Sequence, residues 1–165
     1  MSRPAALAAV ALLLSACGLQ PLYGGGSSGP VATTLRSVEV APIPDRTGWL
    51  LRNKLVERLG ESGTAPPRYR LDVKLDDTIT AFGIRSDQAA TRERRTIRAR
   101  YQLVDLSTGS VVLDATAGSD AGIDIVSSEY ATVAAEQTAA ENLADVVADQ
   151  IVARLGVYAL HTTAR

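Results

Sequence analysis

The sequence predicts an α+β fold, a two-layer sandwich in which two helices pack on one face of a four-stranded sheet. Two patterns indicate this fold class. Four segments place apolar residues at every second position, as half-buried strands do, and two segments carry apolar residues at helical spacing. The order along the chain is strand, helix, three strands, helix, so two apolar helical stripes are available to cover one face of the sheet.

The first strand is expected over residues 35–41, where Val38 and Val40 point to the same face. Pro42 and Pro44 follow. Proline cannot donate a hydrogen bond to a sheet ladder, so the strand ends there.

The first helix is expected over residues 48–59. Thr47 is a suitable N-cap, and Leu51, Leu55 and Leu59 form one apolar stripe. Gly60 is a suitable C-terminal stop.

Three further strands are expected over residues 69–75, with a possible extension to residue 84, over residues 92–104 and over residues 110–117. A turn at residues 105–109 joins the last two into a hairpin. Alternation places one set of side chains toward the helices: Tyr69, Leu71, Val73, Leu75, Ile97, Ala99, Tyr101, Leu103, Val111, Leu113, Ala115 and Ala117.

The last helix is expected over residues 128–155, because apolar residues recur there at every fourth position. Gly156 is a plausible stop, and residues 158–165 are expected to form a frayed tail. The apolar stripe comprises Leu143, Val147, Ile151 and Leu155.

The beginning of the chain has the pattern of a secretory signal. Arg3 precedes an apolar run over residues 5–14, which is too short to span a bilayer, and small residues precede Cys17. Leu-Ser-Ala-Cys resembles the bacterial lipobox, in which the cysteine is lipidated and becomes the new N-terminus. The alternative is a plain signal peptide with an incidental cysteine. Gly18, rather than an aspartate, follows the cysteine, which favours the outer membrane.

These observations divide the chain into a signal peptide (1–16), a lipidated N-terminus with a flexible Gly- and Ser-rich linker (17–34), an α+β domain (35–157) and a tail (158–165). Removing 16 of the 165 residues leaves 149, which is enough for one domain with its own core. Lipidation at Cys17 would attach this domain to the membrane.

Composition excludes several function classes. The chain has 17 Lys and Arg against 18 Asp and Glu, so its overall charge argues against a nucleic-acid partner. One His and one Cys supply a metal site or a Cys/His nucleophile poorly. We expect no metal and no cofactor.

A competing class is an enzyme, for example an envelope hydrolase. The nearest reactive groups are Asp76-Asp77, Ser86-Asp87 and His161. The acids are better explained as strand-end and turn residues, and His161 lies in the expected tail. Because no nucleophile, base and orienting group can be assembled, we expect no enzymatic activity.

The third expected strand carries a row of arginines on its outward face: Arg92, Arg94, Arg98 and Arg100. Arg95 points the other way near the hairpin tip, and Arg85 precedes the loop. Arginine binds phosphate and carboxylate through a planar fork, so the row suits an anionic ligand or an acidic partner. The alternative is a solvated sheet face with cross-strand ion pairs.

A register predicted from the turns divides this row. A turn centred on Ser107 places Asp114 opposite Arg100 and Thr116 opposite Arg98, and a loop near Gln88 places Asp76 beside Arg100 and Thr78 beside Arg98. Arg100 is therefore expected to be structural. Arg92 and Arg98 lack acidic neighbours in this register, and so does Arg94 unless the last strand runs on to Asp120. The candidate ligand-binding residues are Arg92, Arg94 and Arg98, with Arg85 and Arg95 nearby.

Three features together resemble the LPS-assembly lipoprotein LptE family. The opening Cys-Gly-Leu-Gln-Pro-Leu-Tyr-Gly at residues 17–24 is similar to the opening of that family. The order of strands and helices is similar, and so is the Ser-rich entry at residues 127–131 to an Ala- and Glu-rich last helix.

The resemblance implies an outer-membrane lipoprotein on the periplasmic side, anchored through its N-terminal lipid. Members of the family sit inside the β-barrel of LptD, assist its assembly and contact lipopolysaccharide on its way to the outer leaflet. The alternative is another envelope-structural or transporter-accessory lipoprotein.

Overall fold

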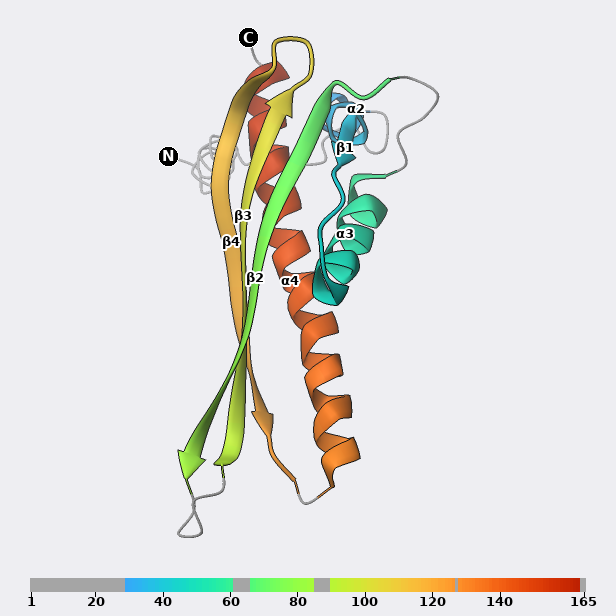
Figure 1. Ribbon diagram of the computed structural model, residues 1–165. Coiled ribbons are helices and arrows are strands. Elements are labelled where there is room, and N and C mark those ends of the chain that lie inside the picture. Colours follow the sequence, from blue (N-terminus) through green and yellow to red (C-terminus); the bar gives the residue numbers. More distant parts are fainter. Residues whose placement is uncertain (1–28, 61–65, 85–89, 127, 164–165) are drawn as a thin grey trace, which may run out of the picture.

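The structure of the chain is a computed structural model that describes residues 29–60, 66–84, 90–126 and 128–163 (Figure 1). It has an α+β fold with a four-stranded sheet, as predicted. Its described residues form three helices, one more than expected. The element order is α2 (Pro30–Arg36), β1 (Val38–Val40), α3 (Arg46–Leu59), β2 (Tyr69–Ile84), β3 (Ala90–Asp105), β4 (Ser110–Asp124) and α4 (Glu129–Thr163).

The strands follow one another across the sheet in the order β1-β2-β3-β4. β1 pairs parallel to β2, and β2, β3 and β4 form an antiparallel meander of long strands. α4 contacts β4 and β3 and also packs against α3 and α2 (Figure 1). The long hairpins extend beyond α3, so one end of the sheet is accompanied only by the first half of α4.

Helix α2 was not predicted, because its residues were assigned to the linker and to the first strand. Pro30 stands at the start of the helix, where its fixed φ suits helical geometry and its missing N–H costs nothing. Val31 and Leu35, one helical turn apart, are buried in the core. The first strand is consequently limited to Val38–Val40.

Helix α3 begins earlier than predicted, with Asp45 rather than Thr47 at its N-cap. Asp45 has φ 68°, a left-handed conformation that is uncommon for a residue with a side chain. Thr47 is buried in the first turn, and its hydroxyl donates to Asp77 instead of capping the helix. Gly60 ends the helix at φ 82°, as predicted.

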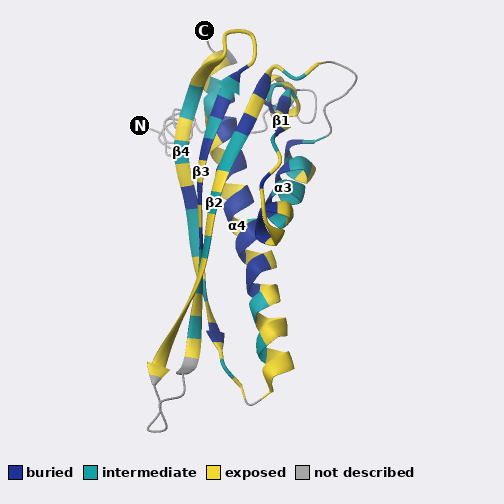
Figure 2. Ribbon diagram, viewed as in Figure 1, coloured by how far each residue is buried: buried dark blue, intermediate teal, exposed yellow. Residues whose placement is uncertain are grey.

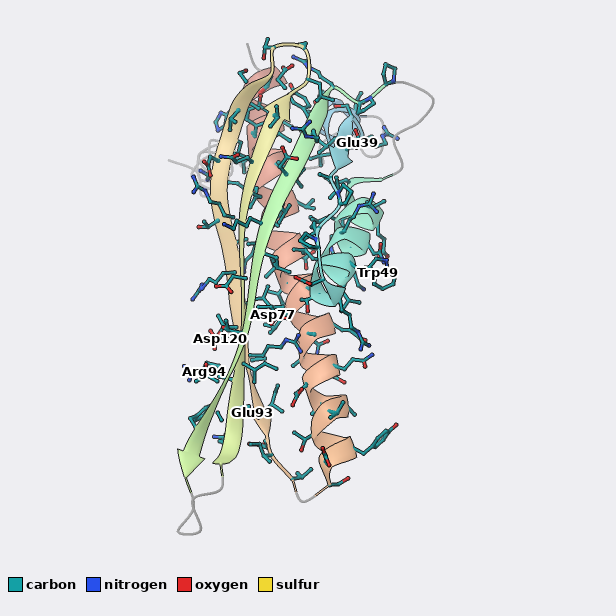
Figure 3. The ribbon with its side chains drawn as sticks, in the orientation of Figure 1. Glu39, Trp49, Asp77, Glu93, Arg94 and Asp120 are labelled. Carbon is teal, nitrogen blue, oxygen red and sulfur yellow. The ribbon has the colours of Figure 1, made fainter. Side chains whose placement is uncertain are left out.

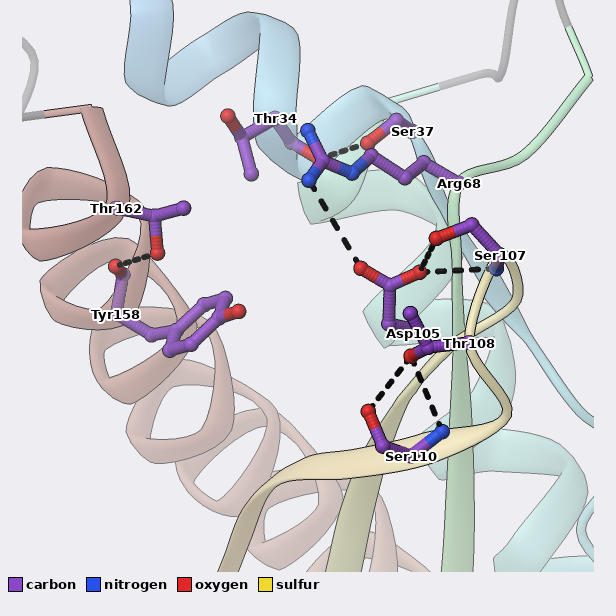
Figure 4. A network of polar contacts seen from close by, with 9 residues as sticks. All are labelled: Thr34, Ser37, Arg68, Asp105, Ser107, Thr108, Ser110, Tyr158 and Thr162. Atoms are coloured by element: carbon purple, nitrogen blue, oxygen red, sulfur yellow. Dashed lines mark hydrogen bonds and ion pairs between the residues drawn. The ribbon is translucent and has the colours of Figure 1, made fainter. Parts of the chain in front are cut away.

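The turn between β3 and β4 is held by Asp105 (Figure 4). Its carboxylate accepts hydrogen bonds from the Ser107 N–H at 2.9 Å and from the Ser107 hydroxyl. Arg68 lies 3.8 Å from the other carboxylate oxygen. These bonds lower the pKa of Asp105 and fix the hairpin at the end of the sheet nearest α2.

Helix α4 runs through Gly156 to Thr163, so the expected stop and the expected frayed tail are both wrong. Tyr158 packs edge-on against the ring of Tyr69 with 6.1 Å between centroids, and Ala159 is fully buried. These contacts continue the helix where glycine alone would weaken it. With 35 residues, the helix is ~50 Å long.

The core lies in one half of the molecule (Figure 2). The predicted stripe of α4, namely Leu143, Val147, Ile151 and Leu155, is buried there against Leu71 and Tyr101, which confirms these predicted faces. Val111 was predicted to point inward but is 50% exposed, because the irregularity beside Leu103 shifts the alternation of β4 at that point. In α4, no residue before Ala139 is buried. Within the part of the chain that the structure describes, no helix is long and apolar enough to cross a membrane.

Candidate ligand-binding surface

The arginine row lies on the sheet face that points away from α4, toward the end of the β2–β3 hairpin. Arg92, Arg94, Arg98 and Arg100 occupy alternate positions of β3, and all four are exposed. Figure 3 shows Arg94 and Asp120 on this side of the sheet. The predicted common face of the row is therefore confirmed.

The register differs from the prediction by two residues on both sides of β3. Arg98 lies opposite Asp76 on β2 and Gly118 on β4, while Arg100 lies opposite Lys74 and Thr116. On the β4 side, an irregularity after Leu103 and a wider turn account for the shift. Sequence alternation fixes which face a residue occupies, but an inserted residue in a bulge changes its cross-strand neighbour.

Arg100 forms the ion pair with Asp114 that was predicted, although the two residues are diagonal rather than opposite. Its Nη2 lies 2.8 Å from Asp114 Oδ2, and Gln102 donates to the same oxygen at 2.8 Å. The hydrogen bonds from Arg100 and Gln102 lower the pKa of Asp114 to about 2. Asp76, expected beside Arg100, lies opposite Arg98.

Arg92 is not uncompensated, which corrects the prediction. β4 extends to Asp124 rather than ending at residue 117, and Asp124 lies opposite Arg92. The Arg92 Nε donates to Asp124 Oδ1 at 2.7 Å, and both side chains are well exposed. An exposed pair of this kind contributes little stability and exchanges readily with other ions.

Arg94 is only loosely paired. Its Nε is 3.8 Å from Asp120 Oδ2, beyond hydrogen-bond distance, and both side chains are more than half exposed. Its guanidinium carbon lies 5.4 Å from the centroid of the Phe82 ring, in cation–π distance. Phe82 therefore supports Arg94 from one side and leaves its donors accessible.

Arg98 has no ion pair among the described residues. Its side chain lies across Gly118, where an added Cβ would come within 2.9 Å of Arg98 Cδ and 3.0 Å of Nη1. Gly118 thus makes room for the arginine stem, and the guanidinium stays exposed. Among the arginines of this row, Arg98 and Arg94 are the most available to an anion.

Arg95 points into the molecule and is committed to internal contacts. Its guanidinium binds Asp77 through two hydrogen bonds, donates to the Thr47 hydroxyl at 3.1 Å and donates to the Glu136 carbonyl at 2.9 Å. Burial acts to raise the pKa of Asp77, but the bonds from Arg95 and Thr47 outweigh it and keep this pKa below its ordinary value. Arg95 is therefore placed to join β2, β3, α3 and α4 rather than to meet a ligand from solvent.

Two predicted residues, Cys17 and Arg85, lie outside the described residues. Sequence patterns did not predict that Asp120 and Asp124 would lie on β4, because the strand was expected to end at residue 117. Apolar or small residues at positions 117, 119, 121 and 123 continue the alternation and were the signal for a longer strand. Among the described residues, no group of three His, Cys, Asp or Glu is placed to hold a metal ion.

Comparisons with known proteins agree on one family and one fold. The family model described as "LptE: Lipopolysaccharide-assembly" matches residues 35–155. A candidate lipoprotein from Caulobacter crescentus CB15 is similar in structure, with 26% identity and a TM-score of 0.68 over 81% of this chain and 98% of that one.

Two other solved structures share the fold at lower identity. The minor lipoprotein from Acinetobacter baumannii is 12% identical with a TM-score of 0.57, over 74% of this chain and 92% of that one. The rare lipoprotein B from Shewanella oneidensis is 7% identical with a TM-score of 0.59, over 76% of this chain and 96% of that one. No curated protein matches the sequence.

Proposed function

Because the chain belongs to the LptE family of lipopolysaccharide-assembly proteins, we propose that it is an outer-membrane lipoprotein that plugs and helps assemble an LptD-type β-barrel and contacts lipopolysaccharide during transport. The observation that carries the ligand contact is the pair of available guanidinium groups, Arg94 and Arg98, on one exposed face. We propose no enzymatic activity.

The chemistry of these two residues supports a contact with phosphate. They occupy positions four apart on one strand and share its outward face, so their guanidinium groups border the same surface. Guanidinium groups bind phosphate oxygens through paired hydrogen bonds. The phosphates of lipid A are anions of this kind, and Phe82 beside Arg94 offers apolar surface next to the charge.

The character of the sheet face supports the plug. Three ion pairs are spread along it: Arg70 with Asp72, Arg100 with Asp114, and Arg92 with Asp124. Large outer-membrane barrels have polar lumens, which suit a face of alternating charge better than an apolar one. The proposed anchor is a lipidated Cys17, which would hold the domain on the periplasmic side of the outer membrane.

The test replaces Arg94 and Arg98 together by Glu in the full lipidated chain. Arg70, at the far end of the same sheet face, and Arg154, exposed on α4, are replaced by Glu in a control with the same change of charge. We expect the first variant to lose lipopolysaccharide binding, by about tenfold or more, while the control keeps it. Binding is measured with purified lipopolysaccharide, and folding is checked by circular dichroism.

The barrel contact is tested separately by affinity purification of the tagged chain from detergent-solubilised outer membranes. Co-purification of a large β-barrel protein supports the plug. If neither a barrel protein nor lipopolysaccharide is retained, the chain is an accessory envelope lipoprotein of another kind and the proposal fails.

A further inference from the structure

Strand β4 forms an outer edge of the sheet, since it pairs only with β3. At Gly118 this edge is already occupied. The Gly118 N–H donates to Gln150 Oε1 at 3.1 Å, and Gln150 Nε2 donates back to the Gly118 carbonyl at 3.4 Å. The side-chain amide of Gln150 thus bonds the strand as the peptide group of a neighbouring strand would.

The next edge groups along β4 have no hydrogen-bond partner within the described part of the chain. Because backbone groups alternate in direction along a strand, Asp120 and Gly122 present their N–H and C=O to the same side as Gly118. No hydrogen bond to these groups from that side is found among the described residues. The stretch beyond Gly118, residues 119–124, is ~20 Å long, since six residues of extended chain span about 3.4 Å each.

A groove of about 620 Å³ lies beside this stretch, between the end of β4 and the first half of α4. Figure 1 shows the helix running alongside the strand at this end of the molecule. The floor is formed by small and aliphatic side chains, among them Ala121, Ile123, Ala135, Ala139, Leu143 and Val146. An exposed strand edge beside a helix is the geometry in which an extended peptide adds to a sheet.

We propose that this groove binds an extended segment of a partner polypeptide, which adds to the sheet as a strand beside β4. Its backbone bonds the free groups of Asp120 and Gly122. Gln150 marks the end of the site, because its amide already takes the place of a peptide group at Gly118.

The side chains around the groove indicate what kind of sequence the bound segment has. On the outward face it meets two carboxylates: Asp120, which Arg94 pairs only loosely, and Asp124, which forms an exposed ion pair with Arg92. On the inward face it meets the aliphatic floor of the groove. The matching sequence alternates basic and aliphatic residues. A second copy of β4 fits poorly, because residues 117–124 contain two aspartates and no cation.

The test uses a blocked seven-residue peptide that alternates lysine and valine, with a glutamate–valine peptide as the control. Both carry a fluorophore and are titrated against the full lipidated chain in detergent micelles. We expect the lysine–valine peptide to bind and to slow amide hydrogen exchange at residues 118–124.

Two substitutions at one position separate backbone pairing from other contacts. Gly122→Pro removes the N–H that faces the groove and should weaken binding by about tenfold or more. Gly122→Ala keeps this N–H, and its Cβ meets open space, so binding should stay within about twofold of the parent. Equal binding by the proline variant would overturn the proposal.

A second variant is needed in case Gly122→Pro does not fold, and it should change which peptide binds rather than abolish binding. Asp120→Lys should reverse the preference, so that the glutamate–valine peptide binds better than the lysine–valine peptide. The proposal is also overturned if the parent chain binds both peptides equally, if protection appears on another edge of the sheet, or if Gly122→Pro dissociates a dimer of the chain that forms without peptide.

Discussion

Arg95 and Asp77 face each other through two parallel hydrogen bonds, Nε to Oδ1 at 2.9 Å and Nη2 to Oδ2 at 2.6 Å, on the helix side of the sheet. Both side chains are largely buried. Thr47 donates to Asp77, and Arg95 also donates to the Glu136 carbonyl. One pair of side chains therefore connects two strands with two helices.

Replacing Arg95 by Ala should destabilise the domain by about 2 kcal/mol or more, because it leaves the Asp77 carboxylate partly buried without its cation. Arg98→Ala is the matched control: it removes an exposed arginine of the same strand and should change stability by less than about 0.5 kcal/mol. Chemical denaturation measures both. Equal losses for the two variants would show that Arg95 does not hold the elements together.

The same pair gives the stability a dependence on pH. The folded-state pKa of Asp77 lies below the ordinary value of 3.8, so the carboxylate stabilises the fold above that value and the contribution is lost as the pH falls through it and below. Asp77→Asn cannot titrate there. Its melting temperature should be lower than that of the parent at pH 7, and the difference should shrink as the medium becomes acidic.

Asp105, Asp114 and Asp145 also have lowered pKa values, so the asparagine variant should still lose stability in acid, with a smaller slope. A difference between parent and variant that stays constant from pH 7 to pH 3 would contradict a role of the Asp77 charge.

The faces of the sheet were predictable except at Val111, beyond the irregularity in β4, but its register was not. Alternation correctly assigned Tyr101 to the core and Arg98 to the solvent, since burial has the same period as the strand. The bulge after Leu103 and the wider turn could not be located from the sequence, so the β4 neighbours of the arginines were misplaced by two residues. The network around Arg95 joins residues 47, 77, 95 and 136, and no local pattern predicts such a set.

The helix ends show the same limit. Gly156 has the local character of a stop, yet packing of Tyr158 on Tyr69 continues α4 past it. Pro30 among Gly and Ser indicates a linker by composition, yet burial of Val31 and Leu35 forms a helix there. Tertiary contacts decided both cases, and single-residue propensities are small beside them.

Val147→Asp should be severely destabilising, because Val147 is fully buried in the centre of the α4 stripe and the new carboxylate has no partner there. Val146→Asp is the neighbouring control, with a side chain that is 43% exposed. The melting temperatures of the two variants should differ widely. A Val147→Asp variant that melts like the parent would mean that α4 presents another face to the sheet.

Cys17→Ala should release the protein from the membrane, because the proposed lipid attachment point is the single cysteine of the chain. We expect the variant in the periplasmic fraction, or retained with an uncleaved signal, in cells that lack the barrel partner. The parent chain, fractionated in parallel, should stay with the outer membrane. Tight outer-membrane association of the alanine variant without the partner would refute the lipoprotein anchor.

Asp120→Asn should increase the affinity for lipopolysaccharide. Asp120 lies 3.8 Å from Arg94 and competes with a phosphate for the same guanidinium, so removing its charge frees the cation. Exposed ion pairs contribute about 0.2–1 kcal/mol, which corresponds to a gain of about 1.5- to 5-fold. Asp114→Asn changes the net charge equally but frees Arg100, which lies farther from the hairpin end. A titration with lipopolysaccharide should show the gain for Asp120→Asn and little change for Asp114→Asn.

Equal gains for the two variants would mean that net charge alone governs the binding of lipopolysaccharide. No gain for either variant would show that Arg94 does not contact the ligand.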